Sequence, residues 1–197
     1  EELAALSKVC RENHLPLYVD GARLAYALAS PENDVTLTDL AELSDVFYIG
    51  GTKCGALFGE AVVIPQKGRI PHFFTIIKQH GALLAKGRIA GIQFGELFTD
   101  GLYQRIGKPA MEAAEQIKAA LKKYGYQLSL DTPTNQIFCI VSNEVMKKIA
   151  QDVEFGFWEK YDETHSVIRF ATSWATTMED TQKLIQILEK INKRKNQ

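Results

Sequence analysis

Three groups of residues in this sequence have the types and spacing that chemistry requires. The first is Asp20 with Arg23 three positions later. The second is Lys53, which stands in the glycine-rich stretch GGTKCG at residues 50–55. The third is Arg169, a charged residue inside an otherwise apolar stretch. Together they supply a carboxylate, an amine and two guanidinium groups, which bind and activate small charged molecules in proteins.

Asp20 directly follows residues 15–19, an apolar run that predicts a short buried strand. In open α/β sheets, ligands bind in the crevice beyond the carboxyl ends of the strands, so a carboxylate at this point can meet a ligand. The alternative is that Asp20 caps the helix predicted over residues 22–29, because aspartate is a good helix cap. Taken alone, Asp20 favours the capping interpretation.

Lys53 lies between the strands predicted at residues 45–49 and 60–64, where we expect little room for solvent. Burial disfavours the ammonium form and lowers the pKa of the amine, which makes a lysine a nucleophile able to form a Schiff base. Two other interpretations stay open, a glycine-rich loop that binds phosphate and a lysine on a surface hairpin. The full P-loop pattern G-x-x-x-x-G-K-[ST] does not occur in the sequence.

Asp20 and Lys53 together indicate a more specific chemistry than either residue alone. Enzymes that use pyridoxal phosphate (PLP) need an amine for the aldehyde carbon of the cofactor and a carboxylate for its pyridine nitrogen. The carboxylate keeps that nitrogen protonated, so the ring can accept electrons from the substrate. A strand followed by Asp20 and a nearby strand followed by Lys53 would present both groups from one side of one sheet.

The elements that must position these residues alternate in the manner of an α/β fold with a mostly parallel sheet. Besides the elements above, we predict helices over residues 1–12, 38–43 (with Thr38 as the N-cap) and most of 69–105. A different series follows, with helices at 107–123, 143–150 and 178–193 and strands at 126–130, 136–141, 153–158 and 166–172. We therefore predict two domains, residues 1–107 and a small α+β domain at residues 108–197.

Three stretches of the sequence resemble a known family. Residues 17–24 (LYVDGARL), 47–56 (FYIGGTKCGA) and 59–63 (GEAVV) resemble motifs of the low-specificity L-threonine aldolases. These are PLP-dependent enzymes of fold type I, within the β-eliminating lyase group. The resemblance covers nearly the whole chain. It implies that residues 1–107 are the remainder of a PLP-binding large domain and that residues 108–197 are the small C-terminal domain.

The resemblance also assigns roles to the residues of the first two groups. It implies that Asp20 pairs with the pyridine nitrogen of PLP and that Lys53 forms the Schiff base with the cofactor. Arg23 follows Asp20 by three residues on the same side of a starting helix, and the family uses this arginine near the substrate carboxylate. Without the motif, Arg23 would be interpreted as a surface arginine whose stem lies along the helix.

Arg169 carries the second arginine role that the resemblance implies. In the family, an arginine of the small domain binds the α-carboxylate of the amino-acid substrate, a task that suits a planar guanidinium. A charge inside an apolar strand is costly unless it is paired. The alternative is therefore that Arg169 pairs with a protein carboxylate such as Asp162 or Glu163.

Thr52 and Lys86 are the candidate ligands for the cofactor phosphate. Thr52 precedes the lysine and could donate its hydroxyl to the phosphate, although a hydroxyl that stabilises the turn fits equally well. Residues 79–86 (QHGALLAK) resemble a glycine-rich segment that ends in arginine in the relatives, where it reaches a phosphate in a neighbouring subunit. Lys86 stands at that position here, and a lysine on a solvated helix face is the alternative.

The activity that the resemblance implies is the cleavage of L-threonine or L-allo-threonine to glycine and acetaldehyde. It assigns no catalytic base to a residue of this chain. One alternative is another PLP-dependent β-eliminating lyase, acting on aromatic or sulfur amino acids. The other is a truncated chain that folds without activity. Because fold type I enzymes build their sites across a dimer interface, we expect a homodimer or homotetramer.

The start of the chain leads us to expect a fragment. Glu1 is not a methionine, and the sequence opens inside a helical pattern. In the family, most of the phosphate-binding loop and the histidine that stacks on the pyridine ring come from sequence upstream of such a segment. The chain alone would then hold only part of the cofactor site.

Composition excludes several other classes of function. The 197 residues are 46% hydrophobic and 24% charged, as in an ordinary globular protein, and the net charge of -1 gives no reason to expect nucleic acid or a membrane surface. No apolar run approaches the ~20 residues of a membrane span. The odd number of widely spaced cysteines predicts a reducing cytoplasm without disulfides. Cys54 is expected to be a packing residue, and the four histidines fit no metal-ligand pattern.

Overall fold

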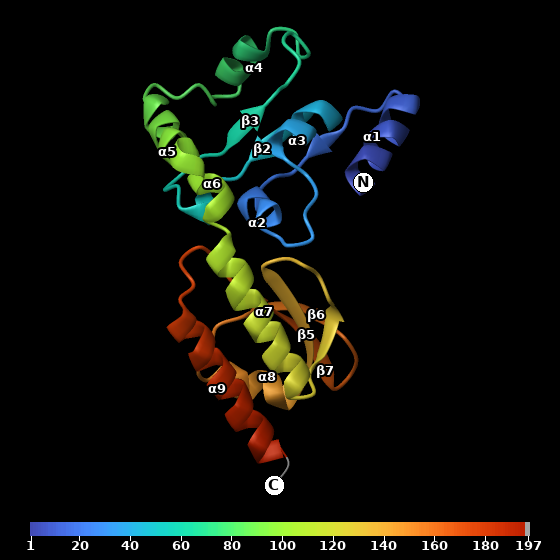
Figure 1. Cartoon of the computed structure of the whole chain (residues 1–197), viewed down its shortest axis with the longest axis vertical. Coiled ribbons are helices and arrows are strands. Elements are labelled where there is room, and N and C mark those ends of the chain that lie inside the picture. The colour runs from blue at the N-terminus through green and yellow to red at the C-terminus, as the bar shows by residue number, and fades with distance from the viewer. Residues whose placement is uncertain (196–197) are drawn as a thin grey trace. The chain divides into compact units, whose positions relative to one another are not determined.

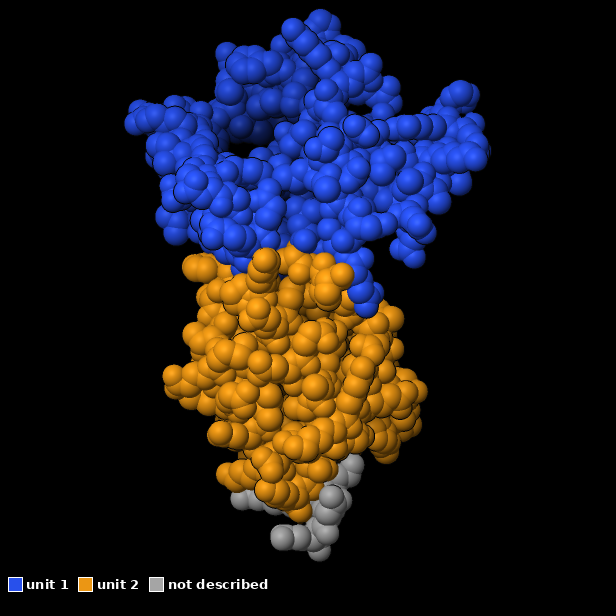
Figure 2. Space-filling view, viewed as in Figure 1, with its two compact units in different colours: residues 1–28, 32–106 blue, residues 29–31, 107–197 orange. Residues whose placement is uncertain are grey.

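The computed structural model describes residues 1–195 and divides the chain into two compact units. One unit contains residues 1–28 and 32–106, and the other contains residues 29–31 together with the chain from residue 107 onward (Figure 2). The sequence predicted a single boundary after residue 107. Within residues 1–195, no helix combines the length and the apolar character that a membrane span requires.

The first unit is built on a small mixed sheet (Figure 1). The strand β1 (Tyr18–Val19) runs parallel to β2 (Val46–Ile49), and β2 pairs antiparallel with β3 (Ala61–Val63). β1 is shorter than predicted, since residues 15–17 lie outside the strand. The backbone N–H of Leu17 donates to the Asp45 side-chain carboxylate at 2.8 Å. In a continuing strand, this N–H would donate to a backbone carbonyl of the neighbouring strand.

The helices of this unit are mostly short. They are α1 (Glu2–Glu12), α2 (Leu24–Leu28), α3 (Leu37–Leu43), α4 (Phe73–Gln79), α5 (Arg88–Phe98) and α6 (Leu102–Arg105), with 3-10 turns η1 (Thr52–Cys54) and η2 (Thr99–Gly101). Left-handed backbone at His72, Gly81 and Asp100 divides the predicted helical stretch 69–105.

The predicted N-cap of α3 was wrong. Thr36, two residues before the predicted Thr38, caps the helix, and its hydroxyl accepts the N–H of Asp39 at 3.2 Å. The Asp39 carboxylate in turn accepts the N–H of Thr36 at 2.7 Å. This capping box needs an acidic residue three positions after the cap, and Asp39 stands at that distance from Thr36 only.

The second unit is the predicted α+β arrangement. Its sheet is antiparallel throughout, in the order β4 (Gln127–Leu130), β5 (Gln136–Ser142), β7 (His165–Ala171) and β6 (Gly156–Lys160). Its helices are α7 (Lys108–Lys123), α8 (Asn143–Ile149) and α9 (Met178–Lys195) (Figure 1). The buried core joins α7 and α9 to the two central strands, through side chains such as Leu121, Leu188, Ile137 and Ile168.

Candidate active site

Two backbone segments of the first unit approach each other too closely for side chains. The backbone N–H of Gly50 donates to the carbonyl of Gly21 at 2.9 Å. A Cβ on Gly21 would lie 1.7 Å from the Tyr48 carbonyl oxygen, and a Cβ on Gly50 would lie 2.5 Å from that of Ala22. Only glycine fits at these two positions. The close approach brings the segment after β1, which carries Asp20, against the segment after β2, which carries Lys53.

The Asp20 carboxylate is held on one side and open on the other. Its Oδ1 accepts the backbone N–H of Ala22 at 2.9 Å and the hydroxyl of Tyr48 at 2.5 Å. Hydrogen bonds from Tyr48 and Ala22 lower the pKa of Asp20, and the positive charges of Lys53 and Arg23 lower it further. Within residues 1–195 no group donates to Oδ2, so the solvent-exposed oxygen is free to accept a ligand.

The predicted burial of Lys53 was wrong. Lys53 lies in the 3-10 turn η1, just beyond the end of β2, and its side chain is exposed while Gly51 and Cys54 on either side are buried. The turn ends at Gly55, whose φ of 110° places it in the left-handed region. No hydrogen bond or ion pair engages the Lys53 amine in the described part of the chain, so the exposed side chain leaves its amine free.

Two buried tyrosines hold the backbone that carries Lys53. The hydroxyl of Tyr26, on α2, donates to the carbonyl of Lys53 itself, and the hydroxyl of Tyr103, on α6, donates to the carbonyl of Gly50 at 2.9 Å. Their exposed fractions are 2% and 0%. Sequence reasoning missed both residues. Their only signal was a large polar aromatic at a core position of a helix, which usually requires a hydrogen-bond partner.

Cys54 packs beneath the same turn. Its side chain is buried and donates to the Gly50 carbonyl at 3.2 Å. Burial raises the pKa of the Cys54 thiol to about 11, so the thiol stays protonated near neutral pH and is a poor nucleophile. These properties support the packing role expected from the sequence.

Glu60 is a second residue that sequence reasoning missed. Its carboxylate accepts the backbone N–H of Gly51 at 2.5 Å and the hydroxyl of Thr52 at 2.7 Å. It therefore fastens the start of the Lys53 turn to the residue that precedes β3. The hydroxyl of Thr52 thus stabilises the turn through Glu60, as one of the two interpretations expected. Its contact with a cofactor phosphate stays a prediction.

Arg23 lies beside Asp20 at a mainly apolar cavity. The cavity has a volume of about 280 Å³, and its wall includes Leu3, Leu24 and Leu40 as well as Asp20 and Arg23. Arg23 is half-buried and forms no ion pair with a carboxylate at salt-bridge distance within residues 1–195. Its guanidinium is therefore available to an anion bound next to Asp20.

Lys86 lies in the turn that precedes α5, with an exposed side chain. The alternative interpretation, which put it on a helix face, was therefore wrong, because α5 begins only at Arg88. No group of three or more histidine, cysteine, aspartate or glutamate residues in the described chain is arranged to hold a metal ion.

Arg169 belongs to β7, a central strand of the second unit. It is half-buried, donates to the Gln136 side chain at 3.2 Å and lies 5.6 Å from the centre of the Trp158 ring. It pairs across the sheet with Gly156, and a Cβ on this glycine would lie 3.3 Å from the guanidinium. The glycine therefore leaves the Arg169 side chain room to lie over the neighbouring strand.

The predicted alternative partners of Arg169 were wrong. The Asp162 carboxylate accepts the backbone N–H groups of Thr164 and His165, and Glu163 pairs with Lys160 at 2.8 Å. Both carboxylates lie at the turn between β6 and β7, whereas Arg169 lies farther along β7. No carboxylate lies within ion-pair distance of Arg169 in the described residues, so its charge is available to a bound anion.

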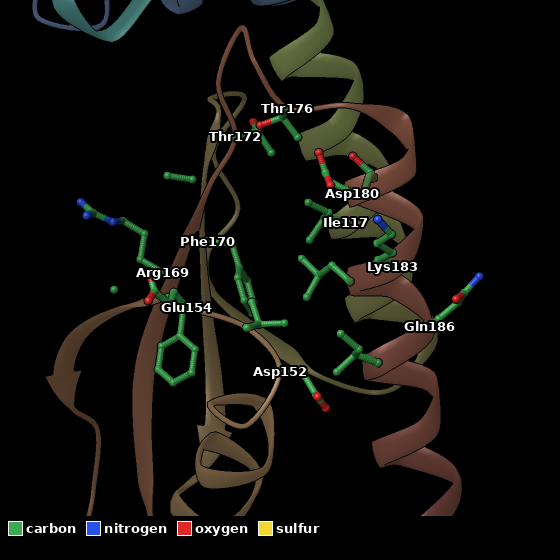
Figure 3. Close-up of a pocket in the computed structure, with 17 residues that line it drawn as sticks. Ile117, Asp152, Glu154, Arg169, Phe170, Thr172, Thr176, Asp180, Lys183 and Gln186 are labelled. Atoms are coloured by element: carbon green, nitrogen blue, oxygen red, sulfur yellow. The ribbon is translucent and has the colours of Figure 1, made fainter.

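A cavity of about 840 Å³ separates β7 from α9 in the second unit (Figure 3). Phe170, Leu184 and Ile187 contribute apolar walls, and Lys183 and Asp180 contribute charges. In Figure 3 the guanidinium of Arg169 points away from α9. Arg169 therefore contributes mainly its stem to this cavity, and the cavity gives the guanidinium no partner.

The close approach at Gly21 makes a sharp prediction. Changing Gly21→Ala adds a Cβ that must displace the Tyr48 carbonyl, so we expect a loss of more than about 2 kcal/mol in the free energy of unfolding. Gly91→Ala is the matched control, since a Cβ on that helical glycine meets nothing within 4 Å and should be neutral or stabilising. Chemical denaturation measures both, and equal stabilities would refute the steric argument.

Comparison with known proteins assigns the chain to a family. Residues 1–144 match the model of the β-eliminating lyase family. The chain is 30% identical over 179 residues to the low specificity L-threonine aldolase of a Pseudomonas species, covering 89% of this chain and 50% of that protein. It is 28% identical over 194 residues to the enzyme of the same description from Pseudomonas aeruginosa, covering 93% and 53%. The chain thus spans about half the length of these curated relatives.

Solved structures show the same similarity. The threonine aldolase of Leishmania major matches with a TM-score of 0.93 and 39% identity, over 97% of this chain and 56% of that one. Serine palmitoyltransferase from Sphingomonas wittichii matches with a TM-score of 0.73 at 11% identity, over 98% of this chain and 51% of that one, which shows a shared fold alone. The predicted α/β class is confirmed as that of fold type I. The chain belongs to the β-eliminating lyase family, and its closer similarities are to threonine aldolases.

Proposed function

We propose that this chain forms part of a PLP-dependent lyase that cleaves L-threonine or L-allo-threonine to glycine and acetaldehyde. The observation that carries the proposal is the juxtaposition of Asp20 and Lys53 at the ends of two adjacent parallel strands. The membership of the β-eliminating lyase family and the similarity to threonine aldolases support it.

The residues at this sheet edge fit two ends of the cofactor. The free Oδ2 of Asp20 suits the protonated pyridine nitrogen, and the unengaged amine of Lys53 suits the aldehyde carbon. When bound, PLP supplies a ring that accepts the electrons released as the Cα–Cβ bond breaks. The Asp20 carboxylate, whose pKa is lowered by its hydrogen bonds, is ionised near neutral pH and can stabilise the positive charge on the ring nitrogen. Thr52 and Lys86 are proposed to contact the phosphate.

The two arginines are proposed to bind the substrate carboxylate. Arg169 and Arg23 lack a carboxylate partner in the described chain, although each is half-buried. A guanidinium presents several N–H groups in a plane and can bind a carboxylate through two hydrogen bonds. Holding the carboxylate would fix the orientation of the Cα–Cβ bond relative to the ring, which selects the bond that breaks.

The proposal predicts that Lys53→Ala abolishes both cofactor attachment and activity. In the complete protein with added PLP, the wild type should show the visible absorbance of the lysine-bound cofactor, and Lys53→Ala should lack it. Lys67→Ala, which removes an exposed lysine from the loop that follows β3, is the matched control and should retain the absorbance. A colourless wild-type protein would contradict the enzyme function and favour the alternative of a chain without activity.

The same preparation distinguishes the two reaction classes. The family description favours, as the second candidate, another PLP-dependent β-eliminating lyase, acting on aromatic or sulfur amino acids. Its activity is assayed as pyruvate formation from serine or cysteine. The aldolase proposal predicts glycine from both threonine isomers at rates well above pyruvate formation. Dominant pyruvate formation would replace the aldolase reaction with β-elimination while keeping the cofactor chemistry.

Arg169→Lys tests the proposed carboxylate site. A lysine keeps the charge but loses the planar pair of N–H groups, so we expect KM for threonine to rise roughly 10- to 100-fold, the size of a lost charge-assisted hydrogen bond. The absorbance of the bound cofactor should not change. Arg105→Lys is the control, because within the described residues Arg105 donates to backbone carbonyls near its own helix and to no side chain. An unchanged KM in Arg169→Lys would exclude the substrate role.

We also propose that the protein is a homodimer or homotetramer. The helix α5 has one buried residue, Leu97, although its sequence is largely apolar. Ile92 on α5 is 67% exposed and Leu57 is 88% exposed, and Gln93 ties the backbone at Leu57 to this helix at 2.6 Å. Large exposed apolar side chains on and beside one helix are typical of an interface between subunits.

Ile92→Glu tests the proposed interface. A charge in the middle of a buried apolar contact is unfavourable, so sedimentation velocity should show a shift toward the monomer. Leu130→Glu, at a similarly exposed leucine of β4, is the matched control and should leave the assembly unchanged. A monomeric wild type would overturn the proposal.

The state of the cysteines supports a proposed cytoplasmic location. Cys10, Cys54 and Cys139 are all free thiols. Two of them are buried in the core, where they pack as small apolar side chains. Proteins of oxidising compartments more often pair their cysteines, so a reducing compartment suits this chain.

A further inference from the structure

We propose that Tyr48 is a positioning residue that fixes the Asp20 carboxylate for the cofactor. The inference rests on the proposed function, since it assigns Asp20 to the pyridine nitrogen. Tyr48 lies in the stretch 47–56 that resembles the family, but neither the sequence patterns nor the resemblance gave it a role. The contact that carries the inference is the hydrogen bond of 2.5 Å from the Tyr48 hydroxyl to Asp20 Oδ1.

The position of the Tyr48 hydroxyl follows from the sheet. Tyr48 is an internal residue of β2, where it pairs with Val62 of β3. Its ring lies beside that of Tyr18 on β1, with 6.2 Å between the ring centres. β1 and β2 are adjacent and parallel, so the residue after β1 comes within reach of a long side chain on β2. The hydroxyl is therefore anchored by backbone pairing and ring packing, whereas Asp20 itself is exposed.

The two oxygens of Asp20 have different environments, and Tyr48 contributes to the difference. Oδ1 accepts from both Tyr48 and the Ala22 backbone, whereas Oδ2 accepts from no group in the described residues. An exposed carboxylate with one donor could rotate, and fixing it on cofactor binding would cost side-chain entropy. With two donors on one oxygen, the plane of the carboxylate is set before the ligand arrives. Oδ2 is then already directed outward for an N–H donor.

Electrostatics keep this hydrogen bond intact across the physiological range. The Tyr48 phenol is protonated and a donor at neutral pH, and the hydrogen bond to the Asp20 carboxylate, together with burial, raises its pKa further, to about 12. The same bond is the largest cause of the lowered pKa of Asp20. The other charged or titratable groups that act on this pair are Lys53, Arg23, Tyr18 and Glu60. Removing the phenol hydroxyl should therefore raise the pKa of Asp20 toward its usual value.

The test compares Tyr48→Phe with Tyr18→Phe in the complete protein. Both variants remove one hydroxyl and keep the ring, but only Tyr48 donates to Asp20. Two quantities are measured: the dissociation constant of PLP by titration, and the pKa of Asp20 in cofactor-free protein by NMR of its side-chain carboxyl. Tyr48→Phe should weaken PLP binding about 2- to 10-fold, as expected for one lost hydrogen bond, and raise the pKa of Asp20. Tyr18→Phe should match the wild type in both.

Each outcome decides between the inference and its alternatives. Unchanged PLP affinity, or an unchanged pKa of Asp20, in folded Tyr48→Phe would overturn the inference. A wild type that does not bind PLP would refute the proposed function, while the Asp20 titration would still show whether Tyr48 holds the carboxylate. If Tyr48→Phe did not fold, Asp20→Asn would serve instead. The pKa of Tyr48, followed by tyrosine absorbance, should then fall from about 12, and no change would again overturn the inference.

Discussion

The close contact between Gly21 and Gly50 is the constraint on which the candidate site depends. The backbones meet directly, with a hydrogen bond of 2.9 Å and no space for a Cβ on either side. This contact sets the distance between the segment with Asp20 and the turn with Lys53. A side chain at either glycine would separate them, and the cofactor proposed for this site could then not reach both Asp20 and Lys53. The contact therefore determines how the segments that carry Asp20 and Lys53 lie relative to each other.

Around this contact, hydrogen bonds hold the backbone of the Lys53 turn in place, whereas the side-chain atoms proposed to bind the cofactor remain free. Buried hydroxyls of Tyr26 and Tyr103 hold backbone carbonyls of the Lys53 turn, and the Glu60 carboxylate holds the N–H at its start. The amine of Lys53 and one oxygen of Asp20 stay open to solvent. A site of this kind binds a ligand with little further ordering, since the cost of fixing the turn is met when the protein folds.

In the second unit, Arg169 is likewise held in place while its charge remains free. Neighbouring groups in the sheet, the Gln136 amide and the Trp158 ring, support the guanidinium without neutralising it. Gly156 on the adjacent strand leaves the side chain room to lie across the sheet. An arginine supported by a neutral amide and an aromatic ring keeps its full charge for an anion. The Arg169 side chain is therefore held in place and still free to bind an anion. The Asp20 carboxylate likewise has one oxygen that is held and one that is free.

The sequence by itself determined the α/β class, most elements, and the strand ends that carry Asp20 and Lys53, because apolar periodicity and glycine placement are local signals. It could not determine the exposure of Lys53 or the hydrogen bond from Tyr48, since both depend on which segments meet in space. The role of Tyr103 has the same origin, since its hydroxyl holds the carbonyl of Gly50, which lies far from it along the chain. Only tertiary structure decides such contacts, because a hydrogen bond between distant residues leaves no spacing pattern in the sequence.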